Sequence, residues 1–297
     1  MTVAKNADVA NVQEALVAEL VQRELQAASK LAGLFTDYSE LVGKGTSSLK
    51  IPRSSSFSVQ DRDNATPTAA SASNLTFSFD QIDLDQSKYV YYVIPGDVEL
   101  DAKPSYEMTA ASRAASAHGR NMDIARLDEL WTGGTAASNV EYDVGVSDFE
   151  ATILNMIEAA DEAEMLDDGN RFLIIRPQER KAALSVANFV QADKYGDRTP
   201  LVTGELGMVY GVRIVVINHV GTVNNTDLQV AAPFGDGHMI LCHRDSLGFA
   251  FHKRPMHDMD KAIEYGAGSM AHTWDVKYGL VALQDGALIV RAGNFAA

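Results

Sequence analysis

Cysteine and long apolar runs are scarce in this chain of 297 residues. Its single cysteine, Cys242, excludes a disulfide within the chain and fits a reducing compartment such as the cytoplasm. No stretch reaches the roughly 18 apolar residues that a membrane-spanning helix needs, and residues 1–10 lack the apolar segment of a secretory signal. The sequence therefore predicts neither membrane insertion nor secretion, and stability must come from packing.

Basic residues are also few relative to acidic ones. The chain has 25 Lys and Arg against 40 Asp and Glu, which gives a formal net charge of −15. A surface that grips phosphate needs a concentrated basic footprint, and no run of Lys and Arg provides one. A chain of this charge could still surround packed DNA without adhering to it. The charge also opposes self-association unless specific interfaces overcome the repulsion.

The motifs of common catalytic chemistries are missing. We find no GxSxG elbow, no P-loop and no CxxC. Gly204, Gly207 and Gly211 could suggest a phosphate-binding turn, but they precede an expected strand and do not lead from a strand into a helix.

The strongest enzyme-like signal is a collection of imidazole, thiol and carboxylate side chains late in the chain. Its members are His238, Cys242, His243, His252, His257, Asp258 and Asp260. Their spacing matches neither the HExxH pattern nor paired CxxC knuckles. Polar groups on strands and turns are therefore the favoured interpretation, and a metal-dependent enzyme is one alternative.

The composition is that of a folded protein, with 46% hydrophobic and 22% charged residues, and the order of parts is unusual. Apolar residues recur at helical spacing from Val9 to Leu34, which predicts amphipathic helices that dock on a neighbouring surface or on the chain's own core. Residues 46–95 follow as an extended excursion, out from Thr46 to Val59 and back from Leu75 to Ile94. Such long connections are uncommon in compact domains. This one predicts either a flexible loop or a hairpin that spans two subunits.

Helices are expected in the next part of the chain. Residues from Tyr106 to Trp131 contain no Pro, which predicts one long alanine-rich helix that spans roughly 40 Å at 1.5 Å per residue. A capping box at Ser147–Glu150 predicts the start of another helix, which continues to about Asp167 and ends before Gly169.

Strands alternate with these helices in the remaining sequence. We expect a buried strand at 172–175, a helix from Pro177 to about Phe189, and strands at 212–218, 228–231 and 239–242. A terminal hairpin is expected from strands at 273–283 and 287–290, joined by a turn at Asp285–Gly286. The alternation predicts a mixed sheet domain into which a second domain is inserted.

This order of parts resembles the major capsid protein of tailed bacteriophages, whose shell fold is shared with encapsulins and herpesvirus floor domains. The resemblance covers essentially the whole chain and is carried by the segments 45–53, 106–131, 172–177, 204–216 and 245–250. Each segment is weak alone, and their order carries the similarity. The resemblance implies an α+β fold with an N-arm at 1–45, an E-loop at 46–95, a peripheral domain at 96–177 and 256–297 with a spine helix at 104–132, and an inserted axial domain at 178–255.

The same resemblance implies a structural protein, with no enzymatic activity and no cofactor or metal. It implies self-assembly as hexamers and pentamers, by way of a procapsid, into an icosahedral virion capsid around double-stranded DNA. The implied partners are a scaffolding protein, a portal protein and a decoration protein, and the implied site of assembly is the host cytoplasm. Some family members begin with a long charged scaffolding segment, whereas in this sequence the helical pattern of the N-arm starts within the first ten residues. This favours a separate scaffolding protein. Residues 52–86 contain no Lys, so cross-linking through this loop is not expected.

Charged residues on the loop and the long helix are the expected partners in ion pairs between subunits. They are Arg53, Arg62, Asp63, Arg113 and Arg120. Exposed ion pairs contribute only about 0–1 kcal/mol each, so many repeated contacts would be needed. An encapsulin-like compartment with peptide-tagged enzyme cargo is the alternative of a different class.

Overall fold

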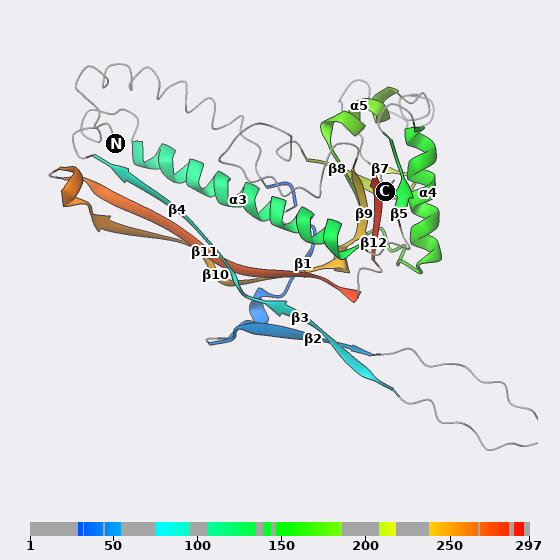
Figure 1. Cartoon of the computed structure of the whole chain (residues 1–297), viewed down its shortest axis with the longest axis horizontal. Helices are drawn as coiled ribbons and strands as arrows, with labels where there is room; N and C mark the ends of the chain where they lie inside the picture. The colour runs from blue at the N-terminus through cyan, green and yellow to red at the C-terminus, as the bar shows by residue number, and fades with distance from the viewer. Residues whose placement is uncertain are drawn as a thin grey trace, which may run out of the picture.

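The structure is a computed structural model that describes residues 29–31, 33–43, 45–54, 75–95, 106–134, 139–143, 147–185, 208–217, 238–266, 268–284 and 288–293. The described residues form a four-stranded sheet, a six-stranded sheet, a long helix that contacts both, and a two-stranded ribbon that projects from the body (Figure 1). Among the described helices, none is long and apolar enough to cross a membrane.

The four-stranded sheet has the order β1-β10-β11-β4. Its strands are β1 (Thr36–Asp37), β10 (Leu247–Lys261), β11 (Met270–Ala282) and β4 (Gln86–Ile94). β10 and β11 form a long antiparallel hairpin, with register shifts between Phe251 and Met256, and the short helix η4 (Ile263–Tyr265) lies at its tip. β4 pairs antiparallel with β11, and β1 pairs parallel with the start of β10.

The long helix α3 (Tyr106–Gly133) has 28 residues, which confirms the helix predicted for 106–131. One side packs on the four-stranded sheet, where Met122 and Ala125 meet Phe249, Val276 and Tyr278. Another side faces a second core that includes Leu127, Leu130 and the strand residue Ile174. α3 therefore joins the two sheets.

The six-stranded sheet has the order β5-β12-β9-β6-β8-β7. Its strands are β5 (Asn139–Glu141), β12 (Ile289–Gly293), β9 (Met239–His243), β6 (Arg171–Ile175), β8 (Val212–Val216) and β7 (Met208–Val209). β6 and β9 are buried at every position, as expected for central strands. The helices α4 (Phe149–Glu162) and α5 (Pro177–Ser185) belong to the same part of the molecule (Figure 1).

The expected boundaries of α4 were wrong at both ends. Its N-cap is Asp148, whose carboxylate accepts the N–H of Glu150 at 3.0 Å, while the Ser147 hydroxyl accepts the N–H of Asp143. The helix ends at Glu162, several residues before Asp167, because Glu164 adopts a φ of 56° and the N–H of Met165 returns to Ala160. This turn buries the Met165 side chain in the core of the six-stranded sheet.

The expected terminal hairpin is also wrong. β11 pairs with β10 and β4, whereas β12 pairs with β9 and β5 in the other sheet. Ile289 and Val290 are fully buried in the six-stranded sheet, so the apolar surface of β12 is covered there. The Asp285–Gly286 turn lies outside the described residues.

The sheets divide the chain differently from the expected domain boundaries. The boundary at 177/178 separates β6 from β8 and β9, which are its neighbours in one sheet. The boundary at 255/256 falls within β10. The extended segment 46–95 contributes to two sheets, because β2 and β3 pair with each other whereas β4 pairs with β11 in the four-stranded sheet. The neighbours of an apolar strand are set by where its two faces can be buried, and not by its order in the chain.

Several expected elements lie wholly or partly outside the described residues. These are residues 9–28 of the amphipathic segment, residues 186–189 of the helix that begins at Pro177, and the strand at 228–231. Residues 29–31 and 33–35, at the end of the amphipathic segment, form bends and turns and not helix. The reason is a tertiary contact, because the Ser29 hydroxyl and the Lys30 N–H both donate to the Asp123 carboxylate of α3.

Candidate functional site: the projecting ribbon and its anchored base

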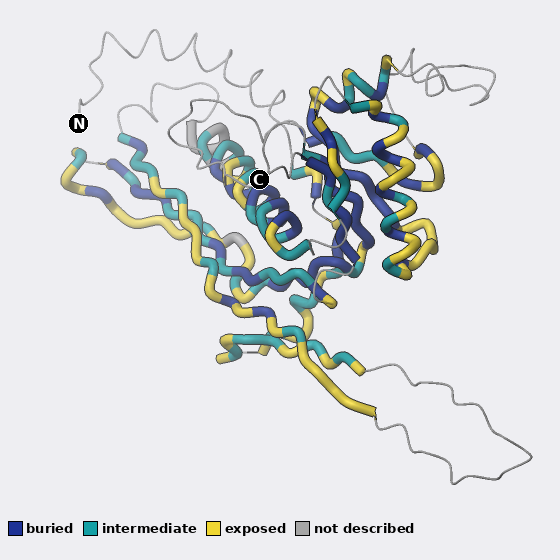
Figure 2. The backbone as a smooth tube through the Cα atoms, turned by 45° about the vertical axis from the view of Figure 1, so that its right-hand side comes forward, coloured by how far each residue is buried: buried dark blue, intermediate teal, exposed yellow. Residues whose placement is uncertain are grey.

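The ribbon is the part of the described chain that extends away from both sheets (Figures 1 and 2). It consists of β2 (Ser48–Ser54) and β3 (Phe77–Asp83), which pair antiparallel from Ser48 opposite Asp83 to Ser54 opposite Phe77. An isolated two-stranded hairpin is marginally stable in water. The ribbon must therefore be held at its base or covered by a partner.

One face of the ribbon carries exposed aromatic side chains. Phe77 and Phe79 are 64% and 60% exposed, and Pro52 and Ser54 lie directly opposite them on the same face. The Lys50 ammonium lies 5.9 Å from the centroid of the Phe79 ring. Exposed aromatic clusters rimmed by polar groups are typical of protein–protein contact surfaces. We call this set, Lys50, Pro52, Phe77 and Phe79, the aromatic face.

The base of the ribbon has a small core of its own. Ile82, Leu84 and Ala250 are buried there. The residues packed against them come from several elements and are Tyr38, Val42, Leu49, Ile51 and Val281. The ribbon is thus fixed to the underside of the four-stranded sheet, the face opposite α3.

Polar contacts support the same attachment. The Asp80 carboxylate accepts the N–H of Gln284 at 2.9 Å and lies 3.5 Å from Nη1 of Arg53. The N–H of Leu84 donates to the carbonyl of Ser47 at 2.9 Å. Asp80 therefore links the ribbon to the segment after β11, and its pair with Arg53 lies within the chain.

A second exposed surface lies on the underside of the four-stranded sheet. Tyr89 of β4, Asp275 of β11 and Met256 of β10 form one row across the strands, and Tyr91 follows on the same face. Val276, next to Asp275, packs towards α3, so this row faces the other way. Tyr89, Tyr91 and Met256 are 74%, 51% and 56% exposed. The described residues thus present an exposed aromatic surface on the ribbon and another on this sheet face.

The structure places three of the five charged residues proposed as interface partners. Arg53 lies on β2 beside Asp80, and Arg113 and Arg120 are partly exposed on α3. Arg62 and Asp63 lie outside the described residues. Their role between subunits stays a prediction. Sequence reasoning missed the aromatic face, although the alternation Phe77-Ser78-Phe79-Asp80 already suggests a strand with two different faces.

The residues of the alternative metal site lie in separate places. His238 stacks on Trp131 with ring centroids 4.0 Å apart, Cys242 is fully buried, and His257 stacks on Trp274. The remaining members lie elsewhere: His243 at the end of β9, and His252, Asp258 and Asp260 exposed along β10. Within the described residues, no group of three or more His, Cys, Asp or Glu is placed to hold a metal.

Two of these polar groups have defined electrostatic surroundings. His243 Nε2 lies 3.0 Å from Oδ1 of Asp168, and the Asn170 side chain donates to the other oxygen at 2.8 Å. The Asn170 and His243 hydrogen bonds lower the pKa of the Asp168 carboxyl well below its usual range. Burial raises the pKa of the Cys242 thiol, so this cysteine is held as an unreactive thiol.

The glycine-rich turn has the geometry of a hairpin. Gly211, with a φ of 80°, lies in the tight turn between β7 and β8, which pair antiparallel. Gly204 and Gly207 lie outside the described residues. The described part of this segment therefore connects two strands and does not lead into a helix, as a phosphate cradle requires.

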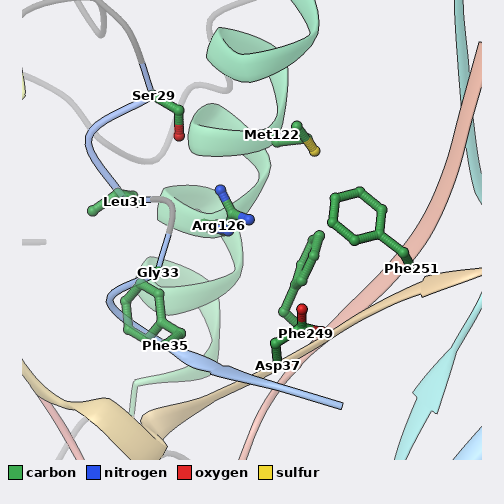
Figure 3. Close-up of a pocket in the computed structure, with 9 residues that line it drawn as sticks. All are labelled: Ser29, Leu31, Gly33, Phe35, Asp37, Met122, Arg126, Phe249 and Phe251. Atoms are coloured by element: carbon green, nitrogen blue, oxygen red, sulfur yellow. The ribbon is translucent and has the colours of Figure 1, made fainter. Parts of the chain in front are cut away.

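A small cavity lies where residues 29–31 and 33–37 cross α3 (Figure 3). Its volume is about 190 Å³, below the roughly 300–1,000 Å³ typical of ligand pockets. Apolar side chains such as Leu31 and Phe35 line it, and Arg126 enters it from α3. The Arg126 guanidinium lies 4.4 Å from the centroid of the Phe249 ring and 3.1 Å from the Asp123 carboxylate. This cluster anchors the N-terminal part of the described chain to α3.

Comparison with known proteins identifies the fold. No family model and no curated protein matches the chain, but solved structures do. A structure of Mycobacterium phage Che8 matches with a TM-score of 0.72 and 18% identity, over 90% of this chain and 92% of that chain. The mature capsid of bacteriophage PhiM1 matches with 0.67 and 15%, over 91% and 88%. The capsid of Cyanophage P-SCSP1u matches with 0.70 and 12%, over 91% and 89%.

These matches extend over about nine-tenths of each chain, so they concern the whole arrangement of sheets and helices. At 12–18% identity they show a shared fold. The chain therefore has the mixed helix-and-sheet fold of phage capsid structures, which confirms the fold class expected from its sequence. The expected N-arm, E-loop and domain bounds stay predictions.

Proposed function

We propose that this chain is the major capsid protein of a tailed bacteriophage and assembles into an icosahedral shell around double-stranded DNA. The observation that carries the proposal is the match to phage capsid structures over about nine-tenths of the chain. A structural role also fits a chain that exposes aromatic side chains on its ribbon and on one face of the four-stranded sheet.

The parts of the fold acquire roles under this proposal. We assign α3 to the spine helix, the four-stranded sheet to the peripheral domain, and the six-stranded sheet with α4 and α5 to the axial domain. The ribbon is the base of the E-loop, and residues 1–45 are the N-arm. Assignment by sheet moves β6 from the expected peripheral domain into the axial domain. It also places all of β10 in the peripheral domain, whereas the expected boundary at 255/256 divides this strand.

The ribbon supplies a physical route to assembly. The aromatic face is left uncovered by the described chain, and a neighbouring subunit would bury it. A contact between different surfaces of two identical subunits is heterologous, and such contacts close into rings when their rotation permits. Repeated contacts of this kind generate hexamers and pentamers, which together make a closed shell.

The remaining partners follow from the same role. They are a separate scaffolding protein that directs a procapsid, a portal protein, a decoration protein, and double-stranded DNA held by non-specific contact. The net charge of −15 lets packed DNA lie inside without adhering tightly. The virion capsid is the final location, and assembly takes place in the host cytoplasm.

The alternative is an encapsulin-like compartment, which shares the shell fold implied by the sequence. The two functions differ in their contents, because a compartment would copurify with peptide-tagged enzyme cargo and a capsid would be filled through a portal. Identification of proteins that copurify with assembled particles distinguishes them. We propose a structural role without enzymatic activity, as the resemblance to capsid proteins implies. Within the described residues, the members of the alternative metal site form no group of three or more possible ligands.

A charge placed on the aromatic face tests the interface. The double variant Phe77→Asp, Phe79→Asp should remain folded, since both side chains are already exposed, and should fail to form shells under conditions in which the wild type does. Ser78→Asp is the matched control, because it adds a charge to the opposite face of the same strand. Sedimentation velocity and negative-stain electron microscopy give the readout. Normal shells from the double variant would exclude this face from assembly.

A further inference from the structure

The ribbon meets the body at two glycines on neighbouring strands of the four-stranded sheet. Gly279 of β11 lies beneath the backbone of Asp83, at the end of β3, and a Cβ built on it would lie 2.9 Å from the Asp83 carbonyl carbon and closer still to its oxygen. A Cβ on Gly248 of β10 would lie 2.9 Å from Cδ1 of Ile82. Ordinary contacts at a Cβ are 3.4–4 Å. At Gly279, where the contact is with backbone, only glycine permits this close approach, and at Gly248 any larger residue requires the Ile82 side chain to shift. We call this pair the glycine seat.

The seat holds the ribbon at a defined angle. Ile82 and Leu84 are buried beside it, and the hydrogen bonds of Asp80 with Gln284 and of Leu84 with Ser47 fix the strands on either side. A flexible hinge would expose its backbone and have few buried contacts. The base of the ribbon has the opposite character, so the angle is a property of the fold.

A methyl group at Gly279 has a calculable effect on that angle. The Asp83 carbonyl group would have to move by roughly 1 Å to restore a carbon–carbon contact of about 3.5–4.0 Å. Gly248 pairs with Val281 and Gly279 with Ala250, so the two contacts are diagonal neighbours about 7–8 Å apart. A displacement of 1 Å over that base tilts the ribbon by roughly 8°, and at about 3.3 Å per residue the far end of β3 would move by about 3 Å.

We infer that Gly248 and Gly279 are positioning residues that set the angle of the ribbon, and through it the curvature of the assembled shell. The second step rests on the proposed function, because it requires the ribbon to contact a neighbouring subunit. In a heterologous assembly the rotation between successive copies depends on the angle between the two contacting surfaces. A tilt of several degrees, repeated at every contact, changes the size of the closed particle or prevents its closure.

The angle itself is measured on unassembled protein. Spin labels on Ser54→Cys, at the far end of β2, and on Glu158→Cys, exposed on α4, report the distance from ribbon to body by pulsed electron paramagnetic resonance. The native Cys242 is buried and stays unlabelled. Gly279→Ala should shift this distance by about 3 Å, and the shift has no counterpart in Gly119→Ala, where the nearest atom lies 3.5 Å from the new Cβ.

A rescue variant keeps the test decisive if Gly279→Ala does not fold. Gly248→Ala meets the end of a side chain, which can yield more easily than backbone. Adding Ile82→Val removes the Cδ1 atom that the new methyl group would meet. The double variant should therefore return the distance towards the wild-type value. Equal distances in the wild type and both alanine variants would overturn the glycine seat.

Electron microscopy of assembled material then tests the curvature. Gly279→Ala should give shells of altered diameter, or open sheets and tubes, while Gly119→Ala gives wild-type particles. Wild-type particles from a variant whose ribbon has moved would overturn the curvature claim and leave the capsid function intact. A wild-type chain that forms no shell, either alone or with the reading frame immediately upstream of its own, would overturn the proposed function and the curvature claim together. The spin-label distances on unassembled protein would then be the test of the glycine seat.

Discussion

The buried carboxylate of Asp123 is predicted to be the polar group on which the attachment of the N-terminal segment depends most. Its side chain is 0% exposed, and it accepts hydrogen bonds from the Ser29 hydroxyl at 2.6 Å, the Lys30 N–H at 2.7 Å and Nη1 of Arg126 at 3.1 Å. Asp123→Ala removes all three contacts and leaves the Arg126 charge buried without this partner. Breaking a buried ion pair in this way typically costs about 3–5 kcal/mol.

Burial lowers the pKa of Arg126, while the neighbouring Asp123 carboxylate raises it. The charged form of Arg126 is therefore stabilised by Asp123. The assay is urea unfolding of the unassembled protein for Asp123→Ala, Arg126→Met and the double variant. Because the double variant leaves no unpaired charge, its loss should fall short of the sum of the single losses by about 0.5–3 kcal/mol. A loss below about 1 kcal/mol for Asp123→Ala, or strictly additive losses, would refute the reasoning.

Three further predictions concern separate parts of the body. Cys242 should resist thiol reagents in the native protein and react once on unfolding, and rapid labelling of native protein would contradict its burial. The lowered pKa of Asp168 stabilises the fold above the unfolded-state value of about 3.9, and this contribution is lost as the pH falls towards the folded-state pKa. The stability difference between wild type and Asp168→Asn should therefore shrink from pH 5 to pH 2, and a constant difference would be contrary to it. Gly133→Ala would push a methyl group into Cβ of Ala282 and should cost about 1–3 kcal/mol. Gly119→Ala, at a helix position where the new Cβ would make an ordinary 3.5 Å contact with Ser29, should be neutral or stabilising. Equal thermal shifts would show that the close approach at Gly133 is not required.

The helices and central strands could be predicted from the sequence because their signals are local. The absence of Pro between Tyr106 and Trp131 was sufficient for α3, and the apolar run at 172–175 for β6. The end of α4 was missed because Glu164, a residue with no special preference for positive φ, makes the turn that buries Met165. That turn depends on the core that Met165 joins, which lies outside any local window.

Strand pairing was the part that the sequence could not provide. The segments 273–283 and 287–290 look like a hairpin because an Asp-Gly pair stands between them in the sequence, yet each pairs with strands of a different sheet. The glycine seat was missed for a related reason. Gly248 and Gly279 read as ordinary strand glycines, and the requirement for them comes from Ile82 and Asp83, which are distant in sequence.

The candidate surfaces were predicted in part. The length of the excursion at 46–95 indicated that part of this segment lies outside a compact core, and the projecting ribbon is consistent with this. The exposure of Tyr89 and Tyr91 could not be predicted, because an aromatic strand residue is equally compatible with a buried face. Charge was a weaker guide, since Arg53 pairs with Asp80 of its own ribbon.

The central claim is tested most directly by the product that the wild-type chain forms when it is expressed with and without the reading frame immediately upstream of its own. Light scattering and electron microscopy of the purified material should show uniform hollow shells, tens of nanometres across, in at least one of the two conditions. A well-folded, discrete small oligomer in both conditions would contradict the capsid function.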